Sequence, residues 1–123
     1  MISAEQKAHW DVFGFLVLRQ LFDSDEIKLI RSAAVEVVNQ EGGGNAFTSA
    51  PGFGTGAFME RHPMLANLVD DDRIYDIPKT LLGPDFVLQY NGGAVWRGDT
   101  PWHGGLGSDV SPDPPYKTAK IAM

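Results

Sequence analysis

The sequence changes character at Gly83-Pro84, and this change constrains the fold more than any other feature. Before it, apolar residues recur mainly at the three- and four-residue spacing of amphipathic helices. After it come two short runs rich in β-branched and aromatic residues, 86–90 and 94–96, which are typical of strands. Residues 117–123 are expected to begin a further extended segment. Helices followed by strands predict an α+β protein.

Two helix starts are indicated by capping boxes. In a capping box, two residues three positions apart each accept, through the side chain, a hydrogen bond from the backbone amide of the other. The first pairs Ser3 with Gln6, and this helix is expected to end at Gly14. The second lies at Asp23 and Glu26, and its helix is expected to end by the glycines 42–44. Residues at helical spacing follow this second start: Ile27, Ile30, Ala34, Val37 and Val38.

Other segments carry weaker signals. The apolar run 15–18 is short and partly β-branched, so a strand buried on both faces is expected. The glycine-rich residues 42–56 are interpreted as a mobile loop, either a substrate-covering lid or a disordered connector. Pro63 suits the first position of a helix. A further helix is predicted up to Leu82, and Pro78 is expected to kink it or delay its start.

Composition excludes several classes of function. The formal charge of −6 and the pI of about 4.8 argue against nucleic-acid binding that depends on Lys and Arg. Without cysteine, a metal site must use imidazole, carboxylate or water. The first residues lack a signal-peptide pattern, and no apolar run is long enough to span a bilayer. We therefore expect a cytoplasmic protein that has no membrane or nucleic-acid partner.

Of the three histidines, only His103 lies where a functional residue is expected. His9 lies within the first predicted helix and His62 precedes Pro63, so packing and helix entry are the roles expected for them. His103 follows the predicted strands and opens into a loop rich in Gly and Pro, and such loops often present functional groups.

At this point the sequence resembles phytanoyl-CoA dioxygenase-like proteins, a branch of the non-haem iron, 2-oxoglutarate-dependent oxygenases. The resemblance follows the family's order through almost the whole chain and corresponds to the front half of its catalytic domain. It rests on HWDVFGFLVL (9–18), LF (21–22), DEI (25–27), LLGPDF (81–86), DTPWH (99–103), PPYK (114–117) and AKIAM (119–123).

The resemblance implies a double-stranded β-helix, or jelly roll, that holds Fe(II) with a His-x-Asp pair and a distal His. By position His103 is the first ligand, but Gly105 stands where the family has Asp. Three interpretations remain open. Asp109 can supply the carboxylate, a halide can occupy the vacated position as in related halogenases, or the protein is a degenerate relative that binds iron poorly. The family's distal His and its 2-oxoglutarate-binding Arg come later than the matched segments.

Further residues have alternative roles. Gln89 and Lys120 are candidates for contact with 2-oxoglutarate. The simpler interpretations are that Gln89 is a solvent-facing strand residue and that Lys120, like Lys117, keeps a strand edge soluble. Tyr90, Trp96 and Trp102 can wall a substrate pocket or belong to the core.

The sequence therefore predicts one domain over residues 1–123, helical over 1–83 and β-rich over 84–123. Its helices are expected to pack on the first strands of an incomplete jelly-roll barrel. The implied activity is hydroxylation of a small organic substrate with Fe(II) and 2-oxoglutarate as cofactors. The alternatives are a halogenase-like variant and a non-catalytic binding or interaction module. Exposed strand edges also make a homo-oligomer possible.

Overall fold

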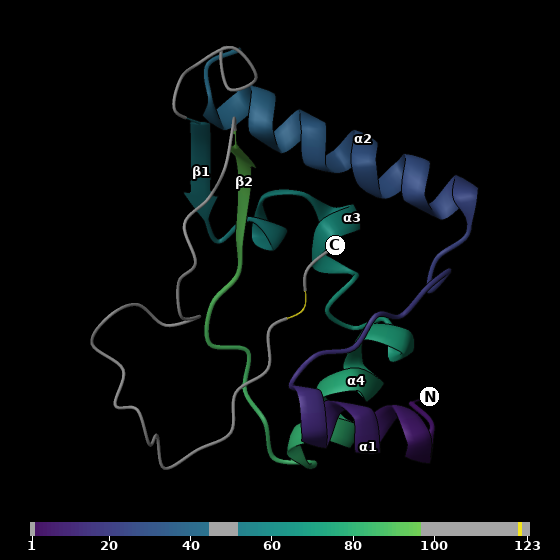
Figure 1. The fold of residues 1–123 in the computed structure, drawn as a ribbon. Helices are drawn as coiled ribbons and strands as arrows, with labels where there is room; N and C mark the ends of the chain where they lie inside the picture. Colours follow the sequence, from purple (N-terminus) through teal and green to yellow (C-terminus); the bar gives the residue numbers. More distant parts are fainter. Residues whose placement is uncertain (1, 45–51, 97–120, 122–123) are drawn as a thin grey trace.

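Two strands are interspersed among the helices, and the computed structural model describes residues 2–44, 52–96 and 121 (Figure 1). In order, the elements are α1 (Ala4–Phe13), α2 (Ser24–Glu41), β1 (Gly52–Gly56), the single 3-10 turn η1 (Met59–Arg61), α3 (Pro63–Ala66), α4 (Asp72–Leu82) and β2 (Gly92–Trp96). This mixture of helices with an antiparallel sheet confirms the α+β prediction.

Both predicted capping boxes are present. The Ser3 hydroxyl accepts from the Gln6 amide, and the Gln6 side chain accepts from the Ser3 amide. Asp23 and Glu26 make the same exchange at the start of α2. Gly14 ends α1 with a φ of 74°, a left-handed conformation that glycine adopts without steric cost. Local side-chain chemistry thus sets where these two helices begin.

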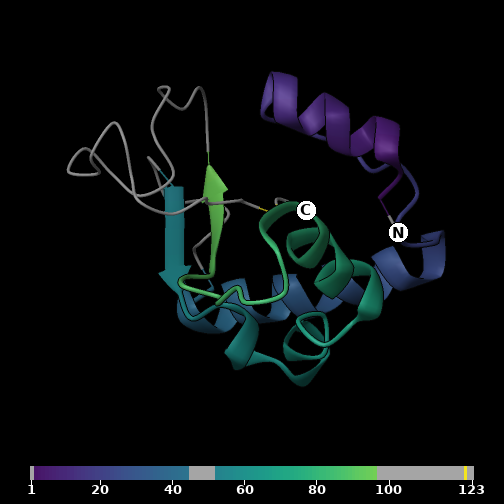
Figure 2. The ribbon, with the colours of Figure 1, turned by 90° about the horizontal axis from the view of Figure 1, so that it is seen from below.

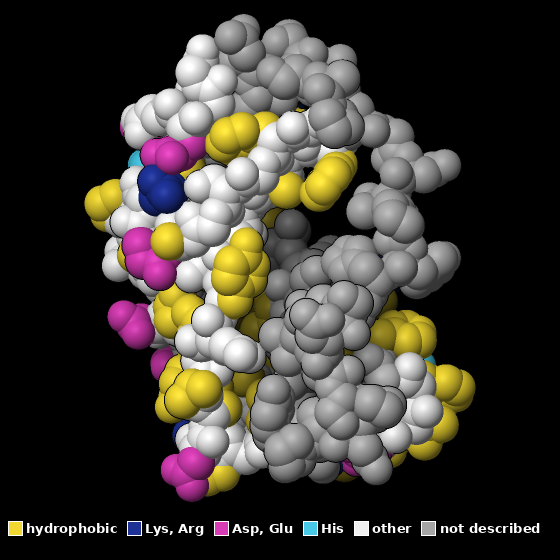
Figure 3. Space-filling view, turned by 90° about the vertical axis from the view of Figure 1, so that its left-hand side faces the viewer, with side chains coloured by type: hydrophobic (Ala, Val, Ile, Leu, Met, Phe, Trp, Pro, Cys, Tyr) yellow, Lys and Arg dark blue, Asp and Glu magenta, His cyan; other side chains and the backbone are white. Residues whose placement is uncertain are grey.

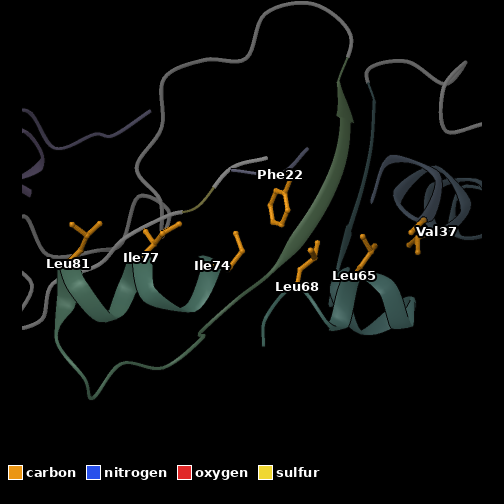
Figure 4. Close-up of a cluster of buried hydrophobic side chains, with 8 residues drawn as sticks. Phe22, Val37, Leu65, Leu68, Ile74, Ile77 and Leu81 are labelled. Atoms are coloured by element: carbon orange, nitrogen blue, oxygen red, sulfur yellow. The ribbon is translucent and has the colours of Figure 1, made fainter. Parts of the chain in front are cut away.

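The core lies between α2, α3 and α4 (Figure 4). Val37 of α2 is its most buried member, with 1% of its surface exposed. The other buried members are Phe22, Ala33, Leu65, Leu68, Ile74, Ile77 and Leu81. Removing this apolar surface from water is the main force that holds the helices together. Within the described residues, no helix is long and apolar enough to span a membrane.

The helix signals of the second half are mostly confirmed. Pro63 occupies the first turn of α3, and the carboxylate of Asp71 caps α4 by accepting from the Arg73 amide. Helix α4 ends at Gly83, as predicted. Pro78 lies inside α4, so the expectation that it delays the start of this helix is wrong.

Strand β1 lies inside the segment that was expected to be a loop. It pairs antiparallel with β2, from Gly52 opposite Trp96 to Gly56 opposite Gly92. Phe58, just beyond β1, packs so closely on Gly93 that a Cβ there would lie 2.3 Å from the Phe58 ring. The loop interpretation is therefore wrong for residues 52–56, and residues 45–51 lie outside the described residues. Strand β1 also lies within the region expected to be helical (residues 1–83), and most of the region expected to be β-rich (residues 84–123) lies outside the described residues.

Two predicted strands are not strands in the structure. Residues 15–18 form neither helix nor strand; Phe15 and Val17 are exposed, whereas Leu16 and Leu18 pack against the core. The segment is thus buried on one side, not on two. Residues 86–90 also form no strand, and most of their side chains are exposed. An apolar run indicates burial, but a strand also requires a partner strand at hydrogen-bonding distance.

Candidate functional site

Of the predicted site residues, the structure describes only Gln89. His103, Asp109 and Lys120 lie outside the described residues, as do Gly105, Lys117 and Trp102. Gln89 is exposed and lies in the connection between α4 and β2. The prediction that it belongs to a strand is therefore wrong, although its exposure agrees with the simpler interpretation of a solvent-facing residue.

Asn91 fixes the start of β2. Its side-chain oxygen accepts from the Met59 amide at 2.8 Å, and its amide nitrogen donates to Glu60 at 3.2 Å. Its carbonyl oxygen accepts from the Ala57 amide at 3.0 Å. Asn91 therefore ties β2 to the turn that follows β1. Strand β2 then ends at Trp96, directly before the segment that carries His103.

Tyr90 and Trp96 are neither core residues nor lining residues of the two described hollows. Their exposed fractions are 72% and 62%. Figure 3 views the molecule from the side on which the sheet lies, and the yellow apolar side chains visible there are separated by white surface of backbone and other side chains. Of the two sequence interpretations, burial in the core is wrong for both residues; the pocket interpretation has no support among the described residues.

Both described hollows lie beside α1. One of about 400 Å³ is bounded by Glu5, His9 and Phe15, among others, and one of about 220 Å³ by Leu18, Arg19 and Asp76, among others. Figures 1 and 2 show α1 at the opposite end of the molecule from the sheet, and Figure 1 shows the end of β2 close to α2. The hollows are thus remote from the point where the chain leaves β2 toward His103.

His9 and His62 have the structural roles that the sequence predicts. The His9 ring lies 4.6 Å from the Phe13 ring and 5.0 Å from the Phe15 ring, measured between centroids. His62 precedes Pro63 and caps α3, because its Nδ1 accepts from the Met64 amide at 3.1 Å.

The strongest electrostatic cluster among the described residues surrounds Arg73. Its guanidinium donates to Glu26 at 2.8 Å, to Asp71 at 2.7 Å and to the Leu21 carbonyl at 3.1 Å. It also lies over the Phe22 ring, 4.4 Å from the centroid. The cluster therefore joins the start of α2 to the start of α4.

These contacts shift the acidity of both carboxyl groups. The hydrogen bonds from Arg73 lower the pKa of Asp71 to about 2, and they are also the main cause of the lowered pKa of Glu26. The same pair raises the pKa of the guanidinium. Sequence reasoning missed this cluster, because Glu26 and Arg73 are far apart in the chain and no local pattern links them. The cluster is structural, since Arg73 already has ionic partners.

The described residues contain no group of three or more His, Asp or Glu side chains that could hold a metal ion. No protein-family model, curated protein or solved structure matches the chain.

Proposed function

We propose that this chain supplies the first metal ligand of a non-haem Fe(II), 2-oxoglutarate-dependent oxygenase of the phytanoyl-CoA dioxygenase-like type. The observation that supports it most is the position of β2, a strand anchored on both its partner strand and η1, which leads directly into the segment with His103. A metal site requires that its ligands be held in defined positions. A ligand that closely follows a strand of fixed position is held in this way at one end.

The donor chemistry of the chain is compatible with Fe(II). Cysteine is absent, so thiolate sites for zinc or iron–sulfur clusters are excluded. Imidazole and carboxylate are the donors of the facial arrangement that non-haem Fe(II) oxygenases use. His103 and Asp109 would provide one donor of each type, and both lie in residues 97–120, outside the described residues. A jelly-roll barrel that extends the β1–β2 sheet belongs to the same proposal.

When bound, Fe(II) and 2-oxoglutarate supply the means to oxidise an unactivated C–H bond, coupled to oxidative decarboxylation of 2-oxoglutarate. The residues of this chain would bind and orient the metal and 2-oxoglutarate. His103 would hold the metal through an imidazole nitrogen, Asp109 would neutralise some of its charge, and Gln89 and Lys120 would contact the carboxylates of 2-oxoglutarate. Gly105 favours one variant of this proposal, in which a halide takes the position of the missing carboxylate and the substrate is halogenated.

The test is an anaerobic titration of the 123-residue chain with Fe(II), with and without 2-oxoglutarate, followed by visible charge-transfer absorption. We expect a band that requires both additions and that is lost in His103→Ala. His9→Ala is the matched control, because it removes an imidazole that packs on Phe13 and Phe15, and its band should persist. Circular dichroism of each variant verifies that it is folded.

Two further comparisons distinguish the alternatives. Loss of the band in Asp109→Ala identifies Asp109 as the carboxylate ligand. A band that survives this change and shifts with added chloride supports the halogenase variant. Absence of a band in the folded wild-type chain under all of these conditions would show that the oxygenase proposal is wrong and would favour a non-catalytic interaction module.

A further inference from the structure

His62 stands where three elements meet. It follows η1, it caps the first turn of α3, and its Nε2 faces the carboxylate of Glu36 on α2 at 3.6 Å. The histidine side chain is 26% exposed and the glutamate side chain is 56% exposed. One imidazole therefore contacts the backbone through one nitrogen and faces an acidic group with the other.

The cap fixes the protonation state of the ring. An N–H group can donate only to a nitrogen that has a free lone pair, so Nδ1 is unprotonated while it accepts from the Met64 amide. The neutral ring then carries its proton on Nε2, on the side of Glu36. An imidazolium ion has a proton on both nitrogens and can accept from neither. Protonation of His62 is thus incompatible with the cap.

We propose that His62 is an acid-released helix cap, which holds the first turn of α3 while the ring is neutral and releases it when the ring is protonated. Release must compete with attraction between the imidazolium and Glu36. More than half of the Glu36 side chain is in water, and an ion pair so exposed contributes little. Loss of the cap therefore destabilises the first turn of α3 by more than this exposed ion pair stabilises the protein.

The other charged groups near His62 are already engaged. Glu41 at the end of α2 binds Arg61 of η1 at 2.7 Å, and Glu60 of η1 accepts from Asn91. Helix α3 itself has no titratable side chain. Glu36 is therefore the group that would respond to a charge on His62.

The release would be local and would act on the joint between the sheet and the helical core. Leu65 is buried in the core and would keep the later residues of α3 in place. Met64 and the residues of η1 lie next to the cap, and η1 connects to β1 and through Asn91 to β2. Acid would therefore loosen the attachment of the β1–β2 sheet to the helices without unfolding them.

The test is NMR spectroscopy of the full chain between about pH 8 and about pH 5, the interval in which histidine side chains generally take up a proton. At the upper end, imidazole nitrogen shifts should show a proton on Nε2 of His62. At the lower end, the opening constant of the Met64 amide, measured by hydrogen exchange, should rise about fivefold, as expected for the loss of a helix cap. The opening constants of core amides in α2 should not change.

Three variants make the result specific. His62→Asn keeps an N-cap oxygen that does not titrate, so its Met64 amide should be insensitive to pH. His9→Asn removes the other described histidine and should leave the response intact. Glu36→Gln removes the competing ion pair and should enlarge the response slightly. The proposal is overturned if the wild-type profile is as flat as that of His62→Asn, or if Nδ1 carries the proton at high pH.

Discussion

Helices α1 and α2 begin with the same signal and are held in the structure very differently. Each starts with a complete capping box. Helix α2 then buries Ala33, Val37 and Val38, whereas α1 has no buried residue. The comparison distinguishes the effect of a helix cap from the effect of burying a helix face. A cap determines where a helix begins, but burial of an apolar face determines how strongly the fold depends on it.

One valine in each helix shows this difference in burial. Val37 is 1% exposed, and Val12 is 74% exposed. Helix α1 also leaves Phe13 exposed, and Trp10 is its one apolar side chain that packs, partly buried, against the core. The described part of the molecule therefore has a tightly packed centre at α2, α3 and α4, and at its edge a helix that buries no residue completely.

The largest expected effect comes from the same substitution made in both helices. Val37→Ala removes two buried carbon groups and leaves a cavity, so the free energy of unfolding should fall by about 2 kcal/mol. Val12→Ala should change it by less than about 0.5 kcal/mol, as exposed positions usually do. Urea denaturation followed by circular dichroism measures both. Equal losses would mean that α1 is packed as firmly as α2.

An intermediate effect is expected when each cap is removed. Asp23→Ala deprives the Asp25 and Glu26 amides of their acceptor, and the free energy of unfolding should fall by about 1 kcal/mol. Ser3→Ala removes the matching acceptor from α1 but should leave the global unfolding midpoint unchanged. Its effect should appear only as faster hydrogen exchange in α1. A global loss in Ser3→Ala as large as that in Asp23→Ala would contradict the comparison.

The smallest effect at neutral pH is expected at the carboxyl groups. The pKa of Asp71 is lowered from 3.8 to about 2, so its contribution to stability is complete above about pH 4 and is lost as the pH falls through about 2. Asp71→Asn keeps a capping oxygen and removes the charge next to Arg73. The stability curves of wild type and variant should therefore differ above about pH 4 and converge near pH 2.

Glu5→Gln is the control for this acid effect. The pKa of Glu5 is also lowered, mainly by a hydrogen bond from Ser3, but its helix buries no residue. Its stability curve should follow that of wild type throughout the acid range. Thermal unfolding midpoints at a series of pH values give all three curves. Parallel curves for Asp71→Asn and wild type down to pH 2 would show that the Arg73 cluster does not act through the charge of Asp71.

The helix boundaries could be predicted from the sequence because their signals are local. Ser3, Asp23 and Pro63 each mark a start, and Gly14 and Gly83 each mark an end, within a few residues of the helix concerned. Strands could be predicted only in part. The strand predicted at residues 94–96 is confirmed as part of β2. Residues 15–18 and 86–90 have the composition of strands but form none, whereas the glycine-rich residues 52–56 form one because β2 lies beside them. Pairing depends on residues far away in the chain.

The candidate site could be predicted only as a set of residue types. His62 and His9 have the structural roles that their surroundings predicted, and Gln89 is exposed but not in a strand. His103, Asp109 and Lys120 lie outside the described residues, so their roles remain predictions. Arg73 was missed because its importance comes from Glu26, which the fold and not the local sequence brings next to it.

The close packing of Phe58 on Gly93 has a consequence for how this sequence can change over time. Any replacement at Gly93 would place a carbon atom against the Phe58 ring at less than contact distance, whereas one at Gly54 would meet the Ala94 methyl group at an ordinary 3.8 Å. The two glycines on adjoining strands therefore differ in what they tolerate. A Cβ at Gly54 makes ordinary contacts, whereas a Cβ at Gly93 requires the Phe58 ring to move.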